Sequence, residues 1–227
     1  SYADDTRDAR TRGLPSMGSG AIFPVTREMI KISPFSIPDH WSRIAAIDFG
    51  WDHPTAAIEA AWDRDTDTIY FIREYRQNKR TPAEHTFALR DWGNHLTWVW
   101  PHDGNAAEKG TGLNLAHQYR EAGLRMHDEH VTFPDGTIAV EAGIMEMLTR
   151  MREGKLKVFE TLSMWFDELD LYRRDKDGKI VKEKDDLISA SRYAMMGRRF
   201  GRAASRRPTW AGRGRGTVAA GTGEVQL

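Results

Sequence analysis

Two short apolar runs with a polar break between them open the most strongly patterned part of the chain. Residues 44–47 are apolar, Asp48 follows them, and Gly50 and the Asp52-His53-Pro54 cluster lead into a second apolar run at Thr55. Apolar runs of this length, bounded by Gly, Asp and Pro, are typical of buried strands joined as a hairpin. The pattern therefore predicts two neighbouring strands, with Asp48 at the end of the first.

Further strand and helix patterns follow along the chain. Residues 68–75, 97–100 and 155–159 are predicted strands, and an Asp-Gly pair within 172–182 predicts an exposed hairpin. Apolar residues at helical spacing, a capping box at Thr81 and Glu84, and Gly123 as a C-cap predict the helices. These helices cover residues 82–92, 112–122, 136–151, 162–171 and 185–198. Three successive strands, then strands alternating with helices, predict an α/β domain with a mixed sheet.

Composition limits the possible classes of protein. A chain of 227 residues, 40% hydrophobic, with eight Trp and nine Phe, suffices for one sizeable core with tails. The absence of cysteine excludes a disulfide framework, a thiolate nucleophile and a Cys-ligated zinc site. No apolar segment approaches the roughly 20 residues that span a bilayer, and no signal-peptide pattern opens the chain, so no membrane partner is expected.

The formal net charge is zero, but the charges are unevenly distributed. No acidic residue occurs from Leu187 to Gly223, a segment that contains eight arginines: Arg192, Arg198, Arg199, Arg202, Arg206, Arg207, Arg213 and Arg215. Such an arm attracts phosphates without reading their sequence, and the alternative is an inert terminus. We interpret residues 1–40 as a linker, 41–200 as the globular domain and 201–227 as a flexible basic tail.

Candidate acidic residues occur at three places in related contexts. Asp48 ends the first core strand, Asp103 follows the strand 97–100, and the Asp185-Asp186 pair opens the last long helix. Functional groups gather beyond the carboxyl ends of adjacent strands, so Asp48 and Asp103 meet if their strands are neighbours. The structural alternatives are a turn-capping role for Asp48 and a helix N-terminal role for Asp185. Helical phase favours Asp186 as the inward-facing member of its pair, because Ser189, Ala190 and Tyr193 follow on its face.

Converging carboxylates with no compensating lysine would repel one another, and a divalent cation resolves this repulsion. Ligand sets made only of oxygen favour Mg²⁺ or Mn²⁺ over zinc. Two such ions about 4 Å apart activate a water and stabilise the leaving oxygen in phosphodiester hydrolysis. His53 and His102 each neighbour a candidate acid, and either orient a ligand or serve as turn and packing residues.

Three segments carry a resemblance to a known family. Arg43–Ile58, the Pro101-His-Asp-Gly104 element and Lys184–Ala194 together resemble the C-terminal nuclease domain of the large terminase subunit of tailed bacteriophages, in particular the headful-packaging, short-tailed phages. Residues 13–24 look like the stretch that joins the ATPase motor to that nuclease, so we expect residues 1–40 to follow an ATPase domain that this chain lacks. The resemblance covers about residues 10–200.

The resemblance implies an RNase H-like mixed sheet flanked by helices, with acidic residues that bind two metal ions. Matched by motif, the metal-binding acids are Asp48, Asp103, Asp185 and Asp186, and we expect Asp48, Asp103 and Asp186 to be catalytic. Many relatives carry a further acid where this chain has Ser189. The resemblance also implies double-stranded DNA, the portal protein and the small terminase subunit as partners, and the host cytoplasm as the location. Candidate DNA-binding residues are Lys109, Arg198, Arg199, Arg202, Arg206 and Arg207.

Two other functions fit the same residues. A Holliday-junction resolvase or a transposase-type nuclease would use the same acids on the same fold. A docking domain without activity would use the sheet as a scaffold and the basic tail to bind DNA or the portal. Nothing in the sequence indicates a base-reading helix, so cleavage of weak sequence specificity is expected.

Overall fold

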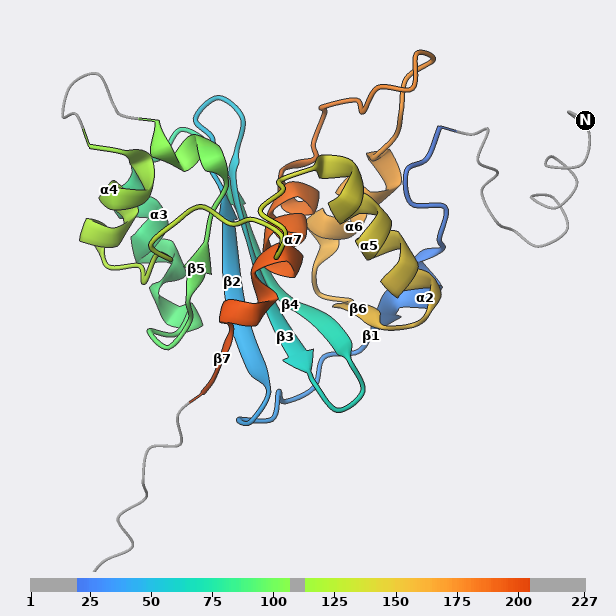
Figure 1. The fold of residues 1–227 in the computed structure, drawn as a ribbon, viewed down its shortest axis with the longest axis horizontal. Helices are drawn as coiled ribbons and strands as arrows, with labels where there is room; N and C mark the ends of the chain where they lie inside the picture. Colours follow the sequence, from blue (N-terminus) through green and yellow to red (C-terminus); the bar gives the residue numbers. More distant parts are fainter. Residues whose placement is uncertain (1–19, 107–112, 205–227) are drawn as a thin grey trace, which may run out of the picture.

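A single mixed sheet lies between two groups of helices in the computed structural model, which describes residues 20–106 and 113–204 (Figure 1). The strands are β1 (Lys31–Ile32), β2 (Ser42–Asp48), β3 (Thr55–Asp63), β4 (Thr68–Gln77), β5 (Trp98–Val99), β6 (Leu156–Phe159) and β7 (Arg202–Ala203). The α-helices are α2 (Arg27–Ile30), α3 (Pro82–Leu89), α4 (Leu115–Ala122), α5 (Val140–Arg152), α6 (Ser163–Leu171) and α7 (Asp186–Gly197). Short 3-10 helices occur at η2 (Arg90–Trp92), η3 (His102–Asn105) and η4 (Arg198–Phe200).

The sheet has the strand order β1-β6-β4-β3-β2-β5, and β7 pairs with the start of β2. The β2–β3–β4 meander is antiparallel, whereas β6 is parallel to β4 and to β1, and β5 is parallel to β2. The prediction of a mixed α/β sheet is therefore confirmed.

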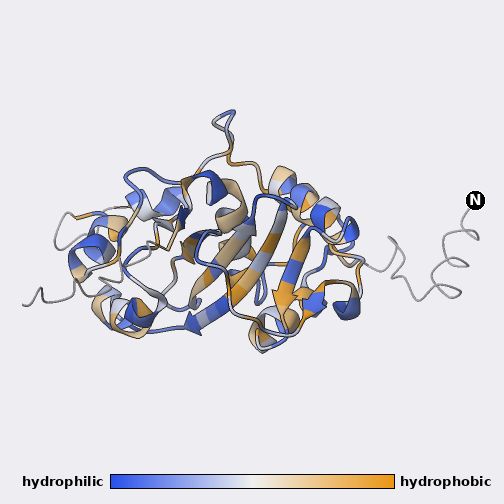
Figure 2. Cartoon of the chain, turned by 90° about the horizontal axis from the view of Figure 1, so that it is seen from below, coloured by the Kyte–Doolittle hydropathy of each residue, from blue (hydrophilic) through white to orange (hydrophobic). Residues whose placement is uncertain are grey.

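Side chains of β2 alternate between the two faces of the sheet, as the period of two requires. Ile44 and Ala46 belong to the apolar cluster beneath α5, α6 and α7, whereas Ala45 and Ile47 belong to the cluster beneath α3 and α4. The hydrophobic colouring in Figure 2 accordingly follows the strands between the helices. By the same alternation, Asp48 lies on the face covered by α7.

The helix-capping signals in the sequence are present in the structure. The Thr81 amide donates to Glu84 Oε2 at 2.8 Å, and the Glu84 amide donates to Thr81 Oγ1 at 3.3 Å, which completes the predicted capping box. Gly123 ends α4 with φ of 117°. The helix predicted from residue 136 begins instead at Val140, because the Asp135-Gly136 turn precedes it.

Part of the N-terminal segment that was interpreted as linker contributes to the core. Ile22, Phe23, Val25 and Ile30 are buried, and β1 forms an edge of the sheet. At the other end of the described chain, β7 extends the pairing of β2 beyond Gly201. No helix within residues 20–106 and 113–204 is both long and apolar enough to cross a bilayer.

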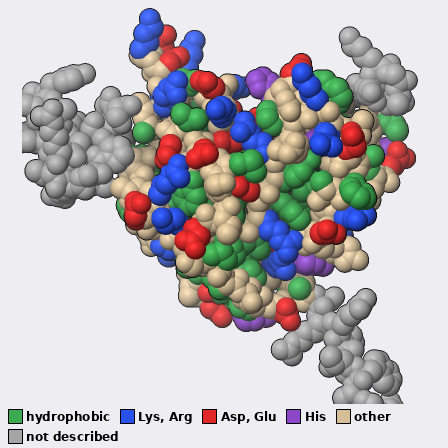
Figure 3. Space-filling model, turned by 180° about the vertical axis from the view of Figure 1, so that it is seen from behind, with side chains coloured by type: hydrophobic (Ala, Val, Ile, Leu, Met, Phe, Trp, Pro, Cys, Tyr) green, Lys and Arg blue, Asp and Glu red, His purple; other side chains and the backbone are tan. Residues whose placement is uncertain are grey.

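The segment between α6 and α7 forms the predicted hairpin. Arg174 and Ile180 face each other as an antiparallel bridge, and Gly178 at the turn has φ of 78°. The hairpin projects from the body at the top right of Figure 1, and Figure 3 shows charged side chains at its tip. Its returning arm leads directly to Asp185 and Asp186.

Candidate metal centre

The parallel pairing of β2 and β5 brings the first two candidate acids to the same end of the sheet. Ala45 and Ala46 of β2 pair with Trp98 and Val99 of β5, which confirms that the two strands are neighbours. Asp48 is the last residue of β2, and Asp103 lies in the 3-10 helix η3 just after β5. The adjacency of these strands therefore accounts for the approach of the two acids.

Helix α7 brings the second pair of acids to this end. It packs across β2 and β3, and its first residue, Asp186, follows Asp185 at the N-cap position. The Asp185 side chain makes no capping hydrogen bond. Asp185 thus lies at the helix N-terminus, as the structural alternative requires, but it contributes only its charge there and no capping hydrogen bond.

A cavity of about 400 Å³ has all four carboxylates in its wall. Asp48, Asp103, Asp185 and Asp186 come from three different elements, and Ser189, Tyr193, His53, Arg192 and Lys182 also line this cavity. The four acids that the sequence analysis singled out thus lie around one cavity. His53 is part of the same wall, whereas the His102 ring packs edge-on against His130 with centroids 4.9 Å apart.

The negative charges of these carboxylates repel one another. Burial, followed by the charges of Asp103 and Asp186, raises the pKa of Asp48 well above its ordinary value. Burial also raises the pKa of Asp103, and burial together with the charge of Asp186 raises the pKa of Asp185. A cation in the cavity would relieve both the burial cost and the repulsion.

The chemistry of the donors fits Mg²⁺ or Mn²⁺, since the four candidate ligands supply only oxygen atoms. Across the described ranges, no three His, Asp or Glu side chains already stand close enough together to hold an ion. The carboxylates thus share one cavity without converging on one point. Asp48, Asp103 and one or both of Asp185 and Asp186 are the residues that would hold the metal.

Sequence reasoning missed the positive charges at this site. The assumption that no lysine compensates the acids is wrong, because Lys182 lines the cavity, as does Arg192. Arg76, at the end of β4, makes an ion pair with Asp186 at 3.1 Å and with Glu168 at 3.2 Å. Burial raises the pKa of Glu168 to about 8, against the opposing effects of the Ile188 amide and Arg76. Lys182 and Arg192 lie within six residues of the Asp185-Asp186 pair in the sequence, and this proximity could have pointed to both. Nothing local points to Arg76.

The aliphatic part of Arg192 packs against Gly143 of the neighbouring helix α5. A Cβ at Gly143 of α5 would lie 2.4 Å from Arg192 Cγ and 2.5 Å from its Cδ, so only glycine leaves room for the arginine stem. The Arg192 guanidinium donates to the Tyr193 hydroxyl at 3.2 Å and lies over the Tyr193 ring. Close packing of α5 against α7 thus directs a cation toward the acids.

Gly143→Ala is therefore expected to lower the free energy of unfolding by about 1–3 kcal/mol, the usual cost of overpacking a filled site. Urea denaturation of the variant measures this loss. In an Arg192→Ala background the same substitution should cost much less, because the clashing atoms are gone. An equal cost in both backgrounds would contradict this packing account.

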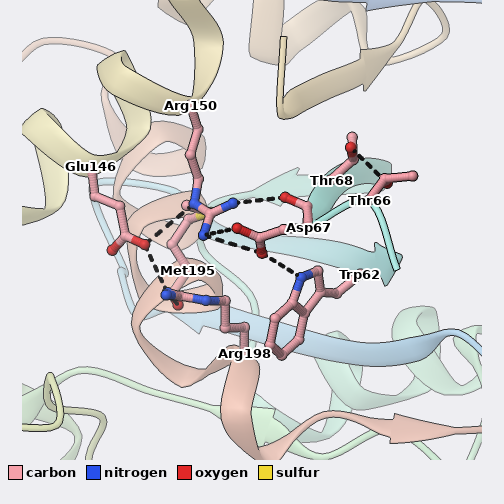
Figure 4. A network of polar contacts seen from close by, with 8 residues as sticks. All are labelled: Trp62, Thr66, Asp67, Thr68, Glu146, Arg150, Met195 and Arg198. Carbon is pink, nitrogen blue, oxygen red and sulfur yellow. Dashed lines mark hydrogen bonds and ion pairs between the residues drawn. The ribbon is translucent and has the colours of Figure 1, made fainter. Parts of the chain in front are cut away.

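The candidate DNA-binding arginines of the described chain follow the C-terminal end of α7, whereas the acids lie at its start. The helix has 12 residues and rises about 1.5 Å per residue, so it separates the two groups. Arg198 donates to Met195 O at 2.7 Å and pairs with Glu146 at 2.9 Å (Figure 4). Arg199 donates to Met196 O at 2.8 Å, and Arg202 is exposed in β7. Lys109, Arg206 and Arg207 lie outside the described residues. Arg198 and Arg199 are thus engaged within the domain and stand apart from the acidic cavity.

Residues 45–198, which contain all four acids, match the model of a known family, described as the terminase RNase H-like domain. The chain belongs to this terminase family. The chain is 48% identical to the large terminase subunit of Salmonella phage P22 over 202 aligned residues. The alignment covers 89% of this chain and 40% of the phage P22 protein. The chain thus spans about two fifths of the length of this curated relative.

Solved structures of terminases share the fold. The P22 large terminase nuclease domain matches with a TM-score of 0.77 and 46% identity, covering 83% of this chain and 97% of that one. The nuclease domain of the large terminase of bacteriophage SPP1, determined with bound Mn, matches with a TM-score of 0.52 and 16% identity, covering 75% and 95%. The predicted RNase H-like fold and the assignment to terminase endonuclease domains are both confirmed.

Proposed function

We propose that this domain cuts concatemeric double-stranded viral DNA during headful packaging, as a metal-dependent endonuclease. The observation that carries the proposal is the meeting of four carboxylates from β2, η3 and the start of α7 at one cavity. Likeness to the P22 nuclease domain supports cleavage of DNA, and the Mn bound by the SPP1 domain supports a divalent cation.

Asp48, Asp103 and Asp186, with Asp185 beside them, would hold one or two Mg²⁺ or Mn²⁺ ions. Such ions, when bound, lower the pKa of a water and neutralise the leaving oxygen of the phosphodiester. The protein contributes the strand end, the 3-10 helix and the helix start that place these carboxylates around one cavity. Arg192, which lines the same cavity, is placed to attract the phosphate that enters it.

A metal titration on duplex DNA tests this proposal and separates it from its rivals. We expect cleavage of linear duplex with Mg²⁺ or Mn²⁺ and none with EDTA. Strong preference for four-way junctions would instead favour a resolvase. A chain that binds DNA but cuts neither substrate with any divalent metal would be a docking domain.

The remaining partners follow from the terminase family. We propose that the domain acts in the host cytoplasm, beside the portal protein and the small terminase subunit. Residues 104–109 lack the spacing of a phosphate-binding loop, so we expect no nucleotide hydrolysis by this segment.

We further propose that the arginine-rich C-terminal segment adds sequence-independent affinity for DNA. Because β7 pairs with β2, truncation after Ala204 keeps the described domain whole while removing Arg206, Arg207, Arg213 and Arg215. We expect the truncated chain to bind duplex DNA more weakly, most visibly at low salt, and with a shallower salt dependence. Fluorescence anisotropy across a salt series measures both quantities.

A matched control keeps the full length and replaces these four arginines with glutamine, and it should behave like the truncation. Equal affinity of the truncated and full-length chains at every salt concentration would rule out the electrostatic role. Docking on the portal, through specific side chains such as Trp210, would then be the better explanation of this segment.

A further inference from the structure

One of the candidate metal ligands is already held by an arginine. The Nε and Nη2 atoms of Arg76 each lie 3.1 Å from the same oxygen of Asp186, Oδ2. Within residues 20–106 and 113–204, the side-chain contacts of Asp186 with Arg76 use Oδ2 and not the other oxygen, Oδ1. Asp186 lines the cavity with the other acids. The ion pair thus occupies one face of the carboxylate and leaves one oxygen for a cation.

Glu168 of α6 contacts both Arg76 and the first turn of α7, the helix that begins with Asp186. Its side chain is 1% exposed, and its Oε1 lies 3.2 Å from Arg76 Nε. Its Oε2 accepts hydrogen bonds from the backbone amides of Leu187 at 2.7 Å and Ile188 at 3.1 Å. One buried side chain therefore binds the first turn of α7 and makes an ion-pair contact, without a hydrogen bond, to the arginine that contacts Asp186. Three elements, β4, α6 and α7, meet at this point.

We propose that Arg76, oriented by Glu168, is a positioning residue that fixes the Asp186 carboxylate so that Oδ1 is the oxygen offered to the metal. This inference rests on the proposed metal-dependent function. Partners that orient a metal ligand commonly change metal affinity by about 10- to 100-fold when they are removed. Two contacts to a single oxygen restrict the rotation of the carboxylate, and the buried Glu168 restricts the arginine in turn.

Charge alone predicts the opposite effect, which makes the inference testable. A guanidinium beside a metal ligand repels a divalent cation, so its removal should tighten metal binding if Arg76 were only a counter-ion. If Arg76 positions Asp186, its removal should weaken metal binding despite the lost repulsion. Lys182 offers a matched control, because it lines the same cavity and no described residue forms an ion pair with it.

The test measures Mn²⁺ binding to the 227-residue chain by calorimetry and by electron paramagnetic resonance. We expect Arg76→Gln and Glu168→Gln each to weaken Mn²⁺ binding by about 10- to 100-fold, and the double variant to lose little more, since both act through one contact. Lys182→Gln should bind Mn²⁺ as tightly as the wild type or more tightly. Circular dichroism melting checks that each variant is folded.

Arg76→Lys keeps a positive charge beside Glu168 if Arg76→Gln fails to fold, and it should bind Mn²⁺ more weakly than the wild type. Wild-type or tighter Mn²⁺ affinity in folded Arg76→Gln or Arg76→Lys would overturn the positioning role alone. Failure of the wild type and Lys182→Gln to bind Mn²⁺ would instead overturn the proposed function, and this inference with it.

Discussion

Asp48→Asn is expected to abolish Mg²⁺- or Mn²⁺-dependent cleavage of duplex DNA while leaving the fold intact. Asp48 is half-buried at the end of β2, where Asp103 and Asp186 act on its charge, and a cation would stabilise its ionised carboxylate there. Even residues that merely orient a metal ligand cost about 10- to 100-fold, so loss of a ligand should exceed about 100-fold. Nicking of supercoiled plasmid measures the rate.

The same substitution should have the opposite effect on the stability of the metal-free protein. Burial and neighbouring acids raise the folded-state pKa of Asp48, so the folded chain binds protons more readily than the unfolded chain. Stability then falls as pH rises from the ordinary aspartate pKa of 3.8 through the raised folded-state pKa. In EDTA at neutral pH the Asn variant should melt at the wild-type temperature or higher, and this advantage should vanish at acidic pH.

Asp52→Asn is the matched control for this pair of measurements. Asp52 lies in the exposed loop just after β2, and its side chain is not part of the cavity wall. The Asp52→Asn protein should therefore cut DNA at the wild-type rate. Wild-type cleavage by a correctly folded Asp48→Asn protein would overturn the metal-site assignment.

Asp103→Asn should abolish cleavage as completely as Asp48→Asn, and Asp186→Asn should be more damaging than Asp185→Asn. Asp186 acts on the pKa of Asp48 more strongly than Asp185 does, and it is held by Arg76 within the folded domain. Single-turnover rates on duplex DNA rank the three variants. The neighbouring acid Glu183, exposed and paired with Arg173, provides the control Glu183→Gln, which should keep the wild-type rate.

A reversed ranking of Asp185→Asn and Asp186→Asn would show that Asp185 is the principal ligand of the pair. Cleavage by Asp103→Asn at the wild-type rate would have a larger consequence. It would show that Asp103, which follows β5, is not a metal ligand, and the site would then consist of Asp48 and the acids at the start of α7.

The elements that carry the site were predictable because their signals are local. The run 44–47 with its Gly and Pro break, and the capping box at Thr81, each act within a few residues of the chain. The convergence of Asp48 and Asp103 required only that β2 and β5 be neighbours. The edge strand β1 was not predictable, because two residues, Lys31–Ile32, carry no periodicity of their own.

The ion pair of Arg76 with Asp186 was missed because its signal is tertiary. Arg76 lies 110 positions before Asp186, and Glu168 reaches the start of α7 from another helix. A sequence pattern records neither contact. Likewise, the sequence showed Arg198 and Arg199 as part of a basic run, whereas their carbonyl contacts at the end of α7 depend on helix geometry.

Anomalous diffraction from crystals of the chain soaked in Mn²⁺ would locate the metal ions. We expect one or two Mn²⁺ peaks in the cavity, bound to carboxylate oxygens of Asp48, Asp103 and Asp186 or Asp185. We also expect these peaks to disappear in Asp48→Asn crystals. Peaks at other residues only, or an empty acidic cavity under conditions in which the protein cuts DNA, would contradict the metal-site assignment.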